Sequence, residues 1–158
     1  MDAIVLLKND HKAVEKLFKQ YEKGKESASA DDKRKLVDEI LTDLSQHTYI
    51  EETIFYPASR KAAPDTTDHV LESVEEHHVV AWLLSELQHL SPSDETFDAK
   101  VTVLMENVRH HVKEEEEEFF PEVRKEMGRN QLAELGERME AAKSDAPSDP
   151  LQLPSAKA

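Results

Sequence analysis

Residues 47–57 have the sequence HTYIEETIFYP, and residues 111–121 have the sequence HVKEEEEEFFP. The two stretches share a His, a Glu four residues later, the Glu after it, a Phe and a final Pro at the same offsets. On an α-helix, residues i and i+4 lie on one face, one turn apart. Each copy therefore places an imidazole beside a carboxylate, a combination of nitrogen and oxygen donors that suits a borderline transition metal. These pairs are His47 with Glu51 and His111 with Glu115.

The repeat extends over most of the chain. A lone His lies 36 residues before His47, at position 11, and another lies 34 residues before His111, at position 77. The residues before these two histidines also correspond, with Asn-Asp in front of His11 and Glu-Glu in front of His77. The sequence therefore predicts two helical hairpins, each supplying one lone His and one His-x-x-x-Glu pair. Packed antiparallel, the hairpins would bring four His and two Glu to one depth of a helical bundle.

The spacing of apolar residues predicts four long helices. They span residues 2–23, a stretch from Asp31 or Asp32 to the break at Pro64, residues 67–90 and residues 95–127. Ser93 or Asp94 is the predicted cap of the fourth helix, and Gly128 is its predicted end. Pro57 lacks an amide proton, and we expect it to bend or loosen the last turn of the second helix.

Short links between long helices predict an all-α, up-down-up-down four-helix bundle. A shorter amphipathic segment through Leu132, Leu135 and Met139 predicts a further C-terminal helix. From Ser144 the chain is rich in Ser, Pro and Asp, which is typical of a mobile tail. We therefore expect one domain over residues 1–143 and a flexible tail over residues 144–158.

Composition limits the functions open to the chain. It has 158 residues, no Cys, and 34 acidic against 20 basic residues, a net charge of −14. This acidic balance argues against a nucleic-acid partner or an anionic membrane. Without Cys there are no disulfides, thiolate zinc sites or thiol catalysis. The N-terminal apolar run of five residues is too short for a signal peptide or a membrane span, and we expect a cytoplasmic protein.

Two carboxylates lie on apolar helix faces, where their negative charges need a compensating partner. Glu51 and Glu115 lie on stripes of Leu, Ile, Val and Phe, and a buried charge is costly unless it is paired or bound to metal. Two cations bridged by these carboxylates, with the four His as terminal ligands, would meet that need. An alternative without metal is a set of ion pairs between the carboxylates and protonated His. The predicted metal ligands are His11, His47, Glu51, His77, His111 and Glu115.

Other candidates are judged by their place on the helices. Four histidines are expected outside the site. His78 and His110 are turned by about 100° from the repeat positions, whereas His69 and His89 match nothing in the repeat and are expected at the surface. Glu118 lies two turns after His111 on the inward side and is a candidate proton carrier or channel residue. Glu15, one turn after the first lone His, is expected to pair with Lys12 or Lys19 rather than with metal.

With these residues, the chain resembles hemerythrin-like proteins of the HHE cation-binding family. The family motif, His…His-x-x-x-Glu…His…His-x-x-x-Glu, is matched by the six predicted ligands, and the Glu-Glu-x-x-Phe-aromatic-Pro continuation is similar in both copies. The resemblance covers about residues 1–127. It implies a four-helix bundle around two iron ions, a di-iron centre bridged by an oxo or hydroxo group and by the two carboxylates.

One departure from the family concerns the third helix. The invertebrate oxygen carriers of the family add a fifth His there, in a His-x-x-x-His pair. In this chain the residues four before and four after His77 are Ser73 and Ala81. One iron position is therefore open, or is filled by water or by another side chain. Tyr49 is the nearest phenol within the first motif, but helical geometry turns it away from His47.

An open iron position favours a redox protein that acts on a small oxygen or nitrogen species. The activities that fit are catalase-like disproportionation of hydrogen peroxide and nitric oxide chemistry. One alternative is a module that binds or senses oxygen or iron without turnover, and another is a bundle that holds zinc or no metal. The expected ligand is O2, H2O2 or NO, with no nucleic acid and no membrane. The expected assembly is a monomer or a weak homo-oligomer.

Overall fold

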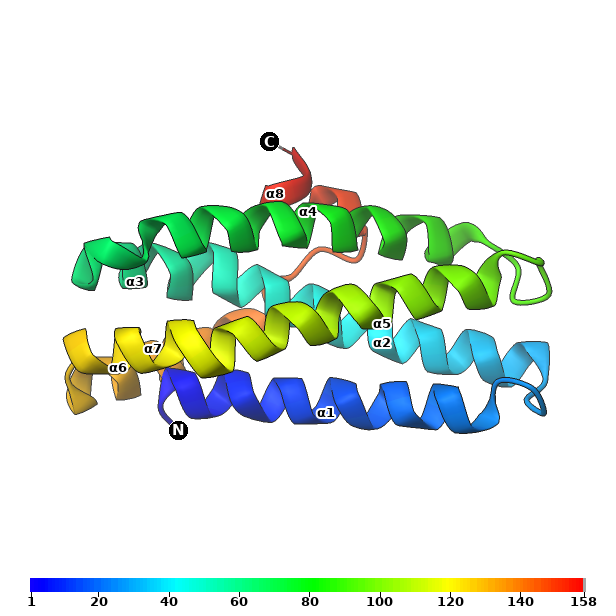
Figure 1. Ribbon diagram of the computed structural model, residues 1–158, viewed down its shortest axis with the longest axis horizontal. Coiled ribbons are helices and arrows are strands. Elements are labelled where there is room, and N and C mark those ends of the chain that lie inside the picture. The colour runs from blue at the N-terminus through cyan, green and yellow to red at the C-terminus, as the bar shows by residue number, and fades with distance from the viewer. Residues whose placement is uncertain (158) are drawn as a thin grey trace.

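Two helical hairpins form the body of the molecule, as the repeat predicts. The computed structural model describes residues 1–157, and every regular element in that range is a helix. In the first hairpin, α1 (Ala3–Gly24) is followed by α2 (Ala30–Ile50), which continues through η1 (Glu51–Phe55) into α3 (Tyr56–Ala62). After η2 (Pro64–Thr66), the second hairpin pairs α4 (Thr67–His89) with α5 (Phe97–Glu114), which continues through η3 (Glu115–Phe119) into α6 (Phe120–Glu126). Figure 1 shows these four long rods side by side, so the predicted four-helix bundle is confirmed.

The helix starts differ slightly from the prediction. The cap of α2 is Ser29 rather than Asp31 or Asp32, because Ser29 Oγ accepts the Asp32 amide proton at 3.1 Å. The two aspartates lie instead in the first turn, where the helix dipole favours negative charge. α5 begins at Phe97, two residues later than predicted. Just before this helix, Asp94 Oδ1 accepts the amide proton of Thr96 at 2.8 Å.

Both long composite rods contain one turn of π-helix at the same place in the repeat. The Tyr56 amide donates to the Glu51 carbonyl, and the Phe120 amide donates to the Glu115 carbonyl, each five residues back. Each of these amides precedes the proline that ends its motif. A proline ring pushes away the carbonyl four residues before it and offers no amide proton, which favours the wider turn. The loosening predicted at Pro57 is therefore a π-turn, and the rod continues beyond it.

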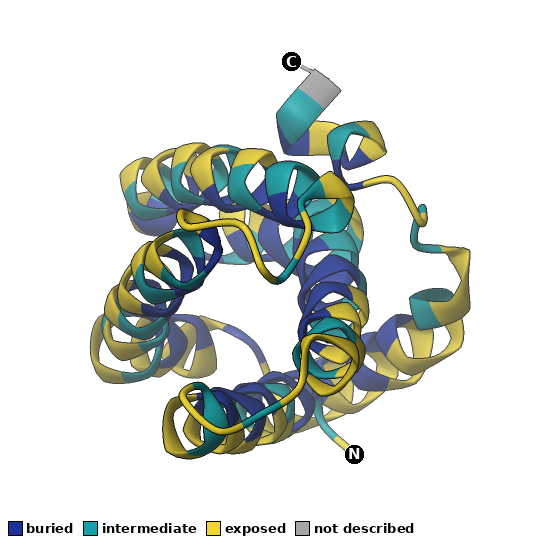
Figure 2. Ribbon diagram, turned by 90° about the vertical axis from the view of Figure 1, so that its right-hand side faces the viewer, coloured by how far each residue is buried: buried dark blue, intermediate teal, exposed yellow. Residues whose placement is uncertain are grey.

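The apolar core has two parts, with the predicted ligands between them. One part lies toward the hairpin loops, and the other lies at the opposite end of the bundle, where it includes α6 and α7 (Arg129–Ala142). On α1, for example, His11 separates Leu7 of one part from Val14 of the other. Figure 2 shows the buried faces of the rods turned toward a common axis. The two parts of the core thus hold the site from both ends.

The chain after α6 packs on the outside of the bundle. α7 is the short C-terminal helix that the sequence predicts, and it lies along α1. Beyond it, η4 (Lys143–Asp145) contacts α2, while η5 (Pro150–Gln152) and α8 (Pro154–Lys157) contact α4. Leu153 is 1% exposed, and Ser155 is buried as well. The flexibility expected for residues 144–158 stays a prediction, and the structure places this stretch against the bundle as far as residue 157. No helix within the described residues has the length and apolar character needed to span a membrane.

Gly136 lets α7 lie directly on the start of α1. A Cβ at this position would clash with the carbonyl oxygen of Met1 and would lie 3.0 Å from the amide nitrogen of Ala3. Both are backbone atoms, which cannot turn aside as a flexible side chain can. We expect Gly136→Ala to lower the free energy of unfolding in urea by roughly 1–3 kcal/mol, the usual cost of overpacking. Gly24→Ala is the control, since nothing lies within 4 Å of a Cβ there. Equal unfolding midpoints for the two variants would contradict this account.

Candidate metal centre

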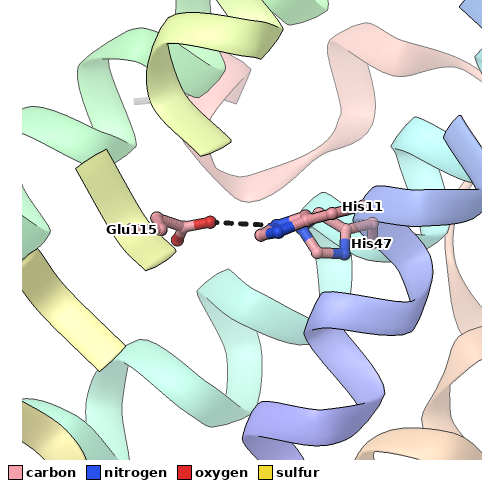
Figure 3. Close-up of side chains that lie close together, drawn as sticks. All are labelled: His11, His47 and Glu115. Carbon is pink, nitrogen blue, oxygen red and sulfur yellow. Dashed lines mark ion pairs between the residues drawn. The ribbon is translucent and has the colours of Figure 1, made fainter. Parts of the chain in front are cut away.

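The six predicted ligands lie together in the middle of the bundle. One group consists of His11, His47 and Glu115, and the other of Glu51, His77 and His111. Within each group the donor atoms lie within 4.8 Å of one another, a spacing that can hold a metal ion. All six residues are buried, and both glutamates are 0% exposed. Figure 3 shows Glu115 reaching toward the two histidines of its group from the opposite side of the bundle.

Each carboxylate faces histidines of both groups. Glu115 Oε1 lies 3.2 Å from His11 Nε2, and Glu115 Oε2 lies 3.4 Å from His111 Nε2. Glu51 Oε1 lies 2.9 Å from His47 Nε2 and 3.5 Å from His77 Nε2. Carboxylates placed in this way are able to span two neighbouring cations.

Several of these donor atoms have no hydrogen-bond partner within the described chain. They are His11 Nε2, His47 Nε2, both carboxylate oxygens of Glu51, and Glu115 Oε1. Opposite charges lie close to them, but without the angles of hydrogen bonds. A buried polar atom left unpaired costs about 1–3 kcal/mol. Imidazole nitrogen and carboxylate oxygen are ligands that iron and zinc accept, so the residues present fit a bound transition metal.

Without metal, protons balance the charge of the site. Burial lowers the pKa of His47, but the charges of Glu51 and Asp10 outweigh it and raise that pKa to about 10. For His111, burial is likewise outweighed, chiefly by Glu115, and the pKa lies well above its ordinary value. Burial raises the pKa of Glu115, yet the charge of His111 outweighs it and holds that pKa well below its ordinary value. In the metal-free centre, His47 beside Glu51 and Asp10, and His111 beside Glu115, are therefore favoured in the protonated form.

Tyr56 is a residue of the site that sequence reasoning missed. Its hydroxyl donates to Glu115 Oε2 at 2.7 Å and lies 3.4 Å and 3.3 Å from the Nε2 atoms of His77 and His111. Ser73, one of the two residues four positions from His77, is buried beside this hydroxyl. Tyr56 therefore places a hydroxyl beside the donor group of His77 and His111. Tyr49, the phenol considered from sequence, is half-buried and packs on the apolar core.

The two donor groups differ in the aromatic residue that lies beside them. The residue that matches Tyr56 in the second copy is Phe120, whose ring stacks on His11 with 5.9 Å between ring centroids. Both aromatic rings are brought inward by the π-turns, since each is the first residue after one. One donor group therefore has a hydroxyl beside it, and the other has a hydrocarbon ring.

Four outer carboxylates, one for each histidine, surround the six donors. Each accepts a hydrogen bond from, or pairs with, the Nδ1 atom of a histidine on a neighbouring rod: Asp10 with His47 at 3.1 Å, Glu52 with His77 at 3.0 Å, Glu76 with His111 at 3.3 Å, and Glu116 with His11 at 2.8 Å. Carboxylates in this position fix the tautomer and the ring orientation of metal-binding His. Together the four pairs form a closed ring that joins α1, α2–η1, α4 and α5–η3, and they turn every Nε2 toward the centre.

The structure places two other acidic candidates, Glu118 and Glu15, away from the donor groups. Glu118, predicted to point inward, is exposed, because the π-turn η3 is wider than the α-helical turn on which that prediction relied. Glu15 pairs with Arg109 at 2.9 Å rather than with a lysine of its own helix. Neither residue contacts the donor groups.

The four remaining histidines lie outside the two donor groups. His89 and His110 are exposed, and His78 is partly buried. His69, expected at the surface, is partly buried instead, with its ring stacked on Phe119 at 4.6 Å between centroids. The two donor groups thus contain the four histidines that the repeat alignment selected, and His69 is less exposed than expected.

Space for a small ligand adjoins the histidines. A cavity of about 30 Å³ touches all four of them and is otherwise lined mainly by Val14, Leu44, Val80, Val108 and Val112. This volume accommodates about one or two water-sized molecules. A larger, open hollow of about 430 Å³ between α1 and α5 also reaches His11 and leads to solvent.

Comparison with known proteins agrees with this geometry. Residues 2–123 match the family model of the hemerythrin HHE cation binding domain. The chain belongs to the hemerythrin HHE family. It is therefore a cation-binding domain, and its buried His and Glu groups are placed to hold metal.

Similar proteins come from several organisms. A DNA nickase from Nostoc sp. is 27% identical over 141 residues, which cover 88% of this chain and 38% of the nickase. An uncharacterized hemerythrin-like protein of Schizosaccharomyces pombe is 24% identical over 140 residues, covering 88% of this chain and 68% of that protein. The crystal structure of an HHE cation binding domain protein from Mycobacterium kansasii matches with a TM-score of 0.74 and 27% identity, over 92% of this chain and 86% of that one. This HHE chain thus spans well under half of the nickase and about two thirds of the yeast protein.

Proposed function

We propose that this chain binds two iron ions at the six donor residues and consumes a small oxygen or nitrogen species there, either hydrogen peroxide or nitric oxide. The observation that carries the proposal is the placement of Glu51 and Glu115, each of which faces histidines of both donor groups. When bound, a pair of iron ions supplies the electron transfers by which two peroxide molecules become two water molecules and dioxygen.

The protein residues around the donors supply positioning, a dry environment and a proton. The outer carboxylates hold the imidazoles in orientation, and the valine-lined cavity excludes bulk water. Burial, together with the charges of Glu115 and Glu51, raises the pKa of Tyr56 well above its ordinary value. Its hydroxyl therefore keeps its proton at Oη, next to Glu115. Peroxide disproportionation needs a proton moved between oxygens, and the position of Tyr56 Oη, 2.7 Å from Glu115 Oε2, supports a role in that transfer.

A second candidate function is reversible binding of oxygen without turnover. The small cavity beside the histidines favours it, because an enclosed apolar space holds a diatomic molecule away from water. DNA nicking, the activity in the name of one relative, is not part of the proposal: the net charge of −14 opposes binding to a polyanion.

The test is metal content per chain together with the optical spectrum of protein expressed with ample iron. Two irons per chain and ligand-to-iron charge-transfer absorption in the near-ultraviolet are expected. Oxygen evolution from added peroxide, or loss of added nitric oxide, then supports turnover. A stable oxygenated form without peroxide consumption would favour the binding module instead. Zinc alone, or no metal, would overturn the redox function while leaving the bundle intact.

Tyr56→Phe tests the proton assigned to the phenol. Phenylalanine already occupies the matching position of the other half, at Phe120, so the variant should fold and keep two irons. We expect peroxide turnover to fall by about 10² or more, the usual contribution of a positioned acid or base. Phe120→Tyr, which adds a hydroxyl to the other half, is the matched control and should not restore turnover in Tyr56→Phe. Turnover in Tyr56→Phe equal to that of the parent would exclude this role.

A further inference from the structure

The C-terminal segment, residues 143–157, reaches two of the four outer carboxylates. Lys143 Nζ donates to Asp10 Oδ1 at 2.7 Å, and the other oxygen of Asp10 lies 3.1 Å from His47 Nδ1. The Ser155 amide donates to Glu52 Oε1 at 2.7 Å. Ser155 Oγ donates to Glu52 Oε2 at 3.1 Å, the same oxygen that pairs with the Nδ1 atom of a site histidine.

Buried side chains and hydrogen bonds hold the C-terminal segment in place. Leu153 is 1% exposed and Pro150 is buried. Asp149 accepts the Leu151 amide proton at 3.0 Å, and Gln88 of α4 donates to the Ser148 carbonyl at 3.2 Å. The segment is therefore held on α4 by the burial of Pro150 and Leu153 and by the hydrogen bond from Gln88, and the Asp149–Leu151 hydrogen bond fixes its own turn.

The contact is selective. Asp10 and Glu52 are held by the segment, whereas the other two outer carboxylates are more open, with side chains 29% exposed for Glu76 and 35% exposed for Glu116. Glu52 is only 3% exposed. The two held carboxylates orient His47 and His77, and these histidines belong to different donor groups. Each donor group thus has one histidine whose carboxylate is fixed from outside and one whose carboxylate is not.

We propose that Lys143 and Ser155 are positioning residues that act through Asp10 and Glu52 to hold His47 and His77 in the orientation that binds metal. The inference rests on the proposed dinuclear function of the six donors. A carboxylate that accepts a second, fixed hydrogen bond has fewer orientations open to it, and the imidazole that it holds is restricted in turn. Without the segment, Asp10 and Glu52 would be free to turn toward solvent, and their histidines would lose that restraint.

The experiment uses full-length Lys143→Met and Ser155→Asp variants loaded with Co2+, whose absorption reports each bound ion. Lys143→Met removes the ammonium but keeps its apolar stem, and Ser155→Asp places a like charge beside Glu52. Each change should speed the release of one of the two Co2+ ions to an excess of chelator, and the double variant should speed the release of both. Since loss of an outer partner usually changes metal affinity by 10–100-fold, we expect about 3–10-fold for contacts one bond further out.

Matched variants separate positioning from folding. Lys143→Arg and Ser155→Thr keep the donors and should release Co2+ like the parent, as should Lys125→Met and Ser148→Ala at exposed sites. The melting temperature of the metal-free Lys143→Met protein should stay near that of the parent. Unchanged release in Lys143→Met and Ser155→Asp would overturn the inference, as would faster release that merely follows a lower melting temperature.

A second measurement does not depend on metal. In the metal-free protein, the Nδ1 protons of His47 and His77 should exchange with solvent faster in Lys143→Met and Ser155→Asp, respectively, than in the parent. If the parent holds fewer than two Co2+ per chain, the dinuclear function fails, and these exchange rates still decide whether the segment orients the rings. Exchange rates equal to those of the parent would overturn the inference.

Discussion

Replacing Glu115 with Gln is expected to abolish binding of the proposed iron pair. Each carboxylate oxygen of Glu115 faces a histidine of a different donor group, at 3.2 Å and 3.4 Å, and an amide cannot bridge two cations as a carboxylate does. Gln keeps the side-chain volume and can still accept the hydrogen bond from Tyr56, so the bundle should remain folded. Glu51→Gln should behave in the same way. Metal content by mass spectrometry and the near-ultraviolet spectrum are the measurements.

The control for this experiment is a substitution of Glu117, which lies on the same helical turn as Glu115. Glu117 is exposed and carries the same charge, so Glu117→Gln changes the net charge as Glu115→Gln does without touching the donors. It should keep two irons per chain and the parent spectrum. A Glu115→Gln protein with two irons and an unaltered spectrum would show that this carboxylate does not bridge them. The Ala variants of the two buried glutamates should lose the iron pair as well, but they also leave an unfilled space.

The six donors were predictable because their spacing repeats. His-x-x-x-Glu places two side chains on one face of a helix whatever surrounds it, and an internal repeat identifies which of several histidines matter. Tyr56 was not predictable by the same rule. It lies five residues after Glu51, which on an α-helix turns it by about 140° away from that residue. The π-turn cancels much of this rotation, and its signal in the sequence is the proline that ends both copies of the motif.

The outer carboxylates were visible in the sequence but could not be assigned. An acid precedes each lone His, at Asp10 and Glu76, and a second Glu follows each motif carboxylate. Each of these acids pairs with a histidine on a different rod, so the pairing depends on helix packing that local spacing does not contain. The same holds for the C-terminal segment. Its composition is that of a tail, and its attachment rests on a few buried residues and on hydrogen bonds to distant helices, which composition alone does not reveal.

Raising the pH from about 7 to about 10 is expected to destabilise the metal-free protein. Burial opposes protonation of His47, but Glu51 and Asp10 prevail and raise its pKa from 6.5 to about 10. A group whose pKa is raised by folding stabilises the folded state fully below its unfolded pKa and loses that contribution as the pH rises through the folded value. The pKa values of His77 and His111 are raised in the same direction. The free energy of unfolding in urea should therefore fall over this range.

Loading the site with metal should remove this alkaline loss. The ions would take the place of the protons that balance Glu51 and Glu115, so the loaded protein has no imidazolium to deprotonate there. Binding must release those protons, and apparent metal affinity should therefore rise with pH in the range where the metal-free protein becomes less stable. Titration of metal into weakly buffered protein at about pH 7 would measure the protons released. Metal-free protein of constant stability up to about pH 10, with no proton release on loading, would mean that the buried carboxylates are balanced by something other than the histidines beside them.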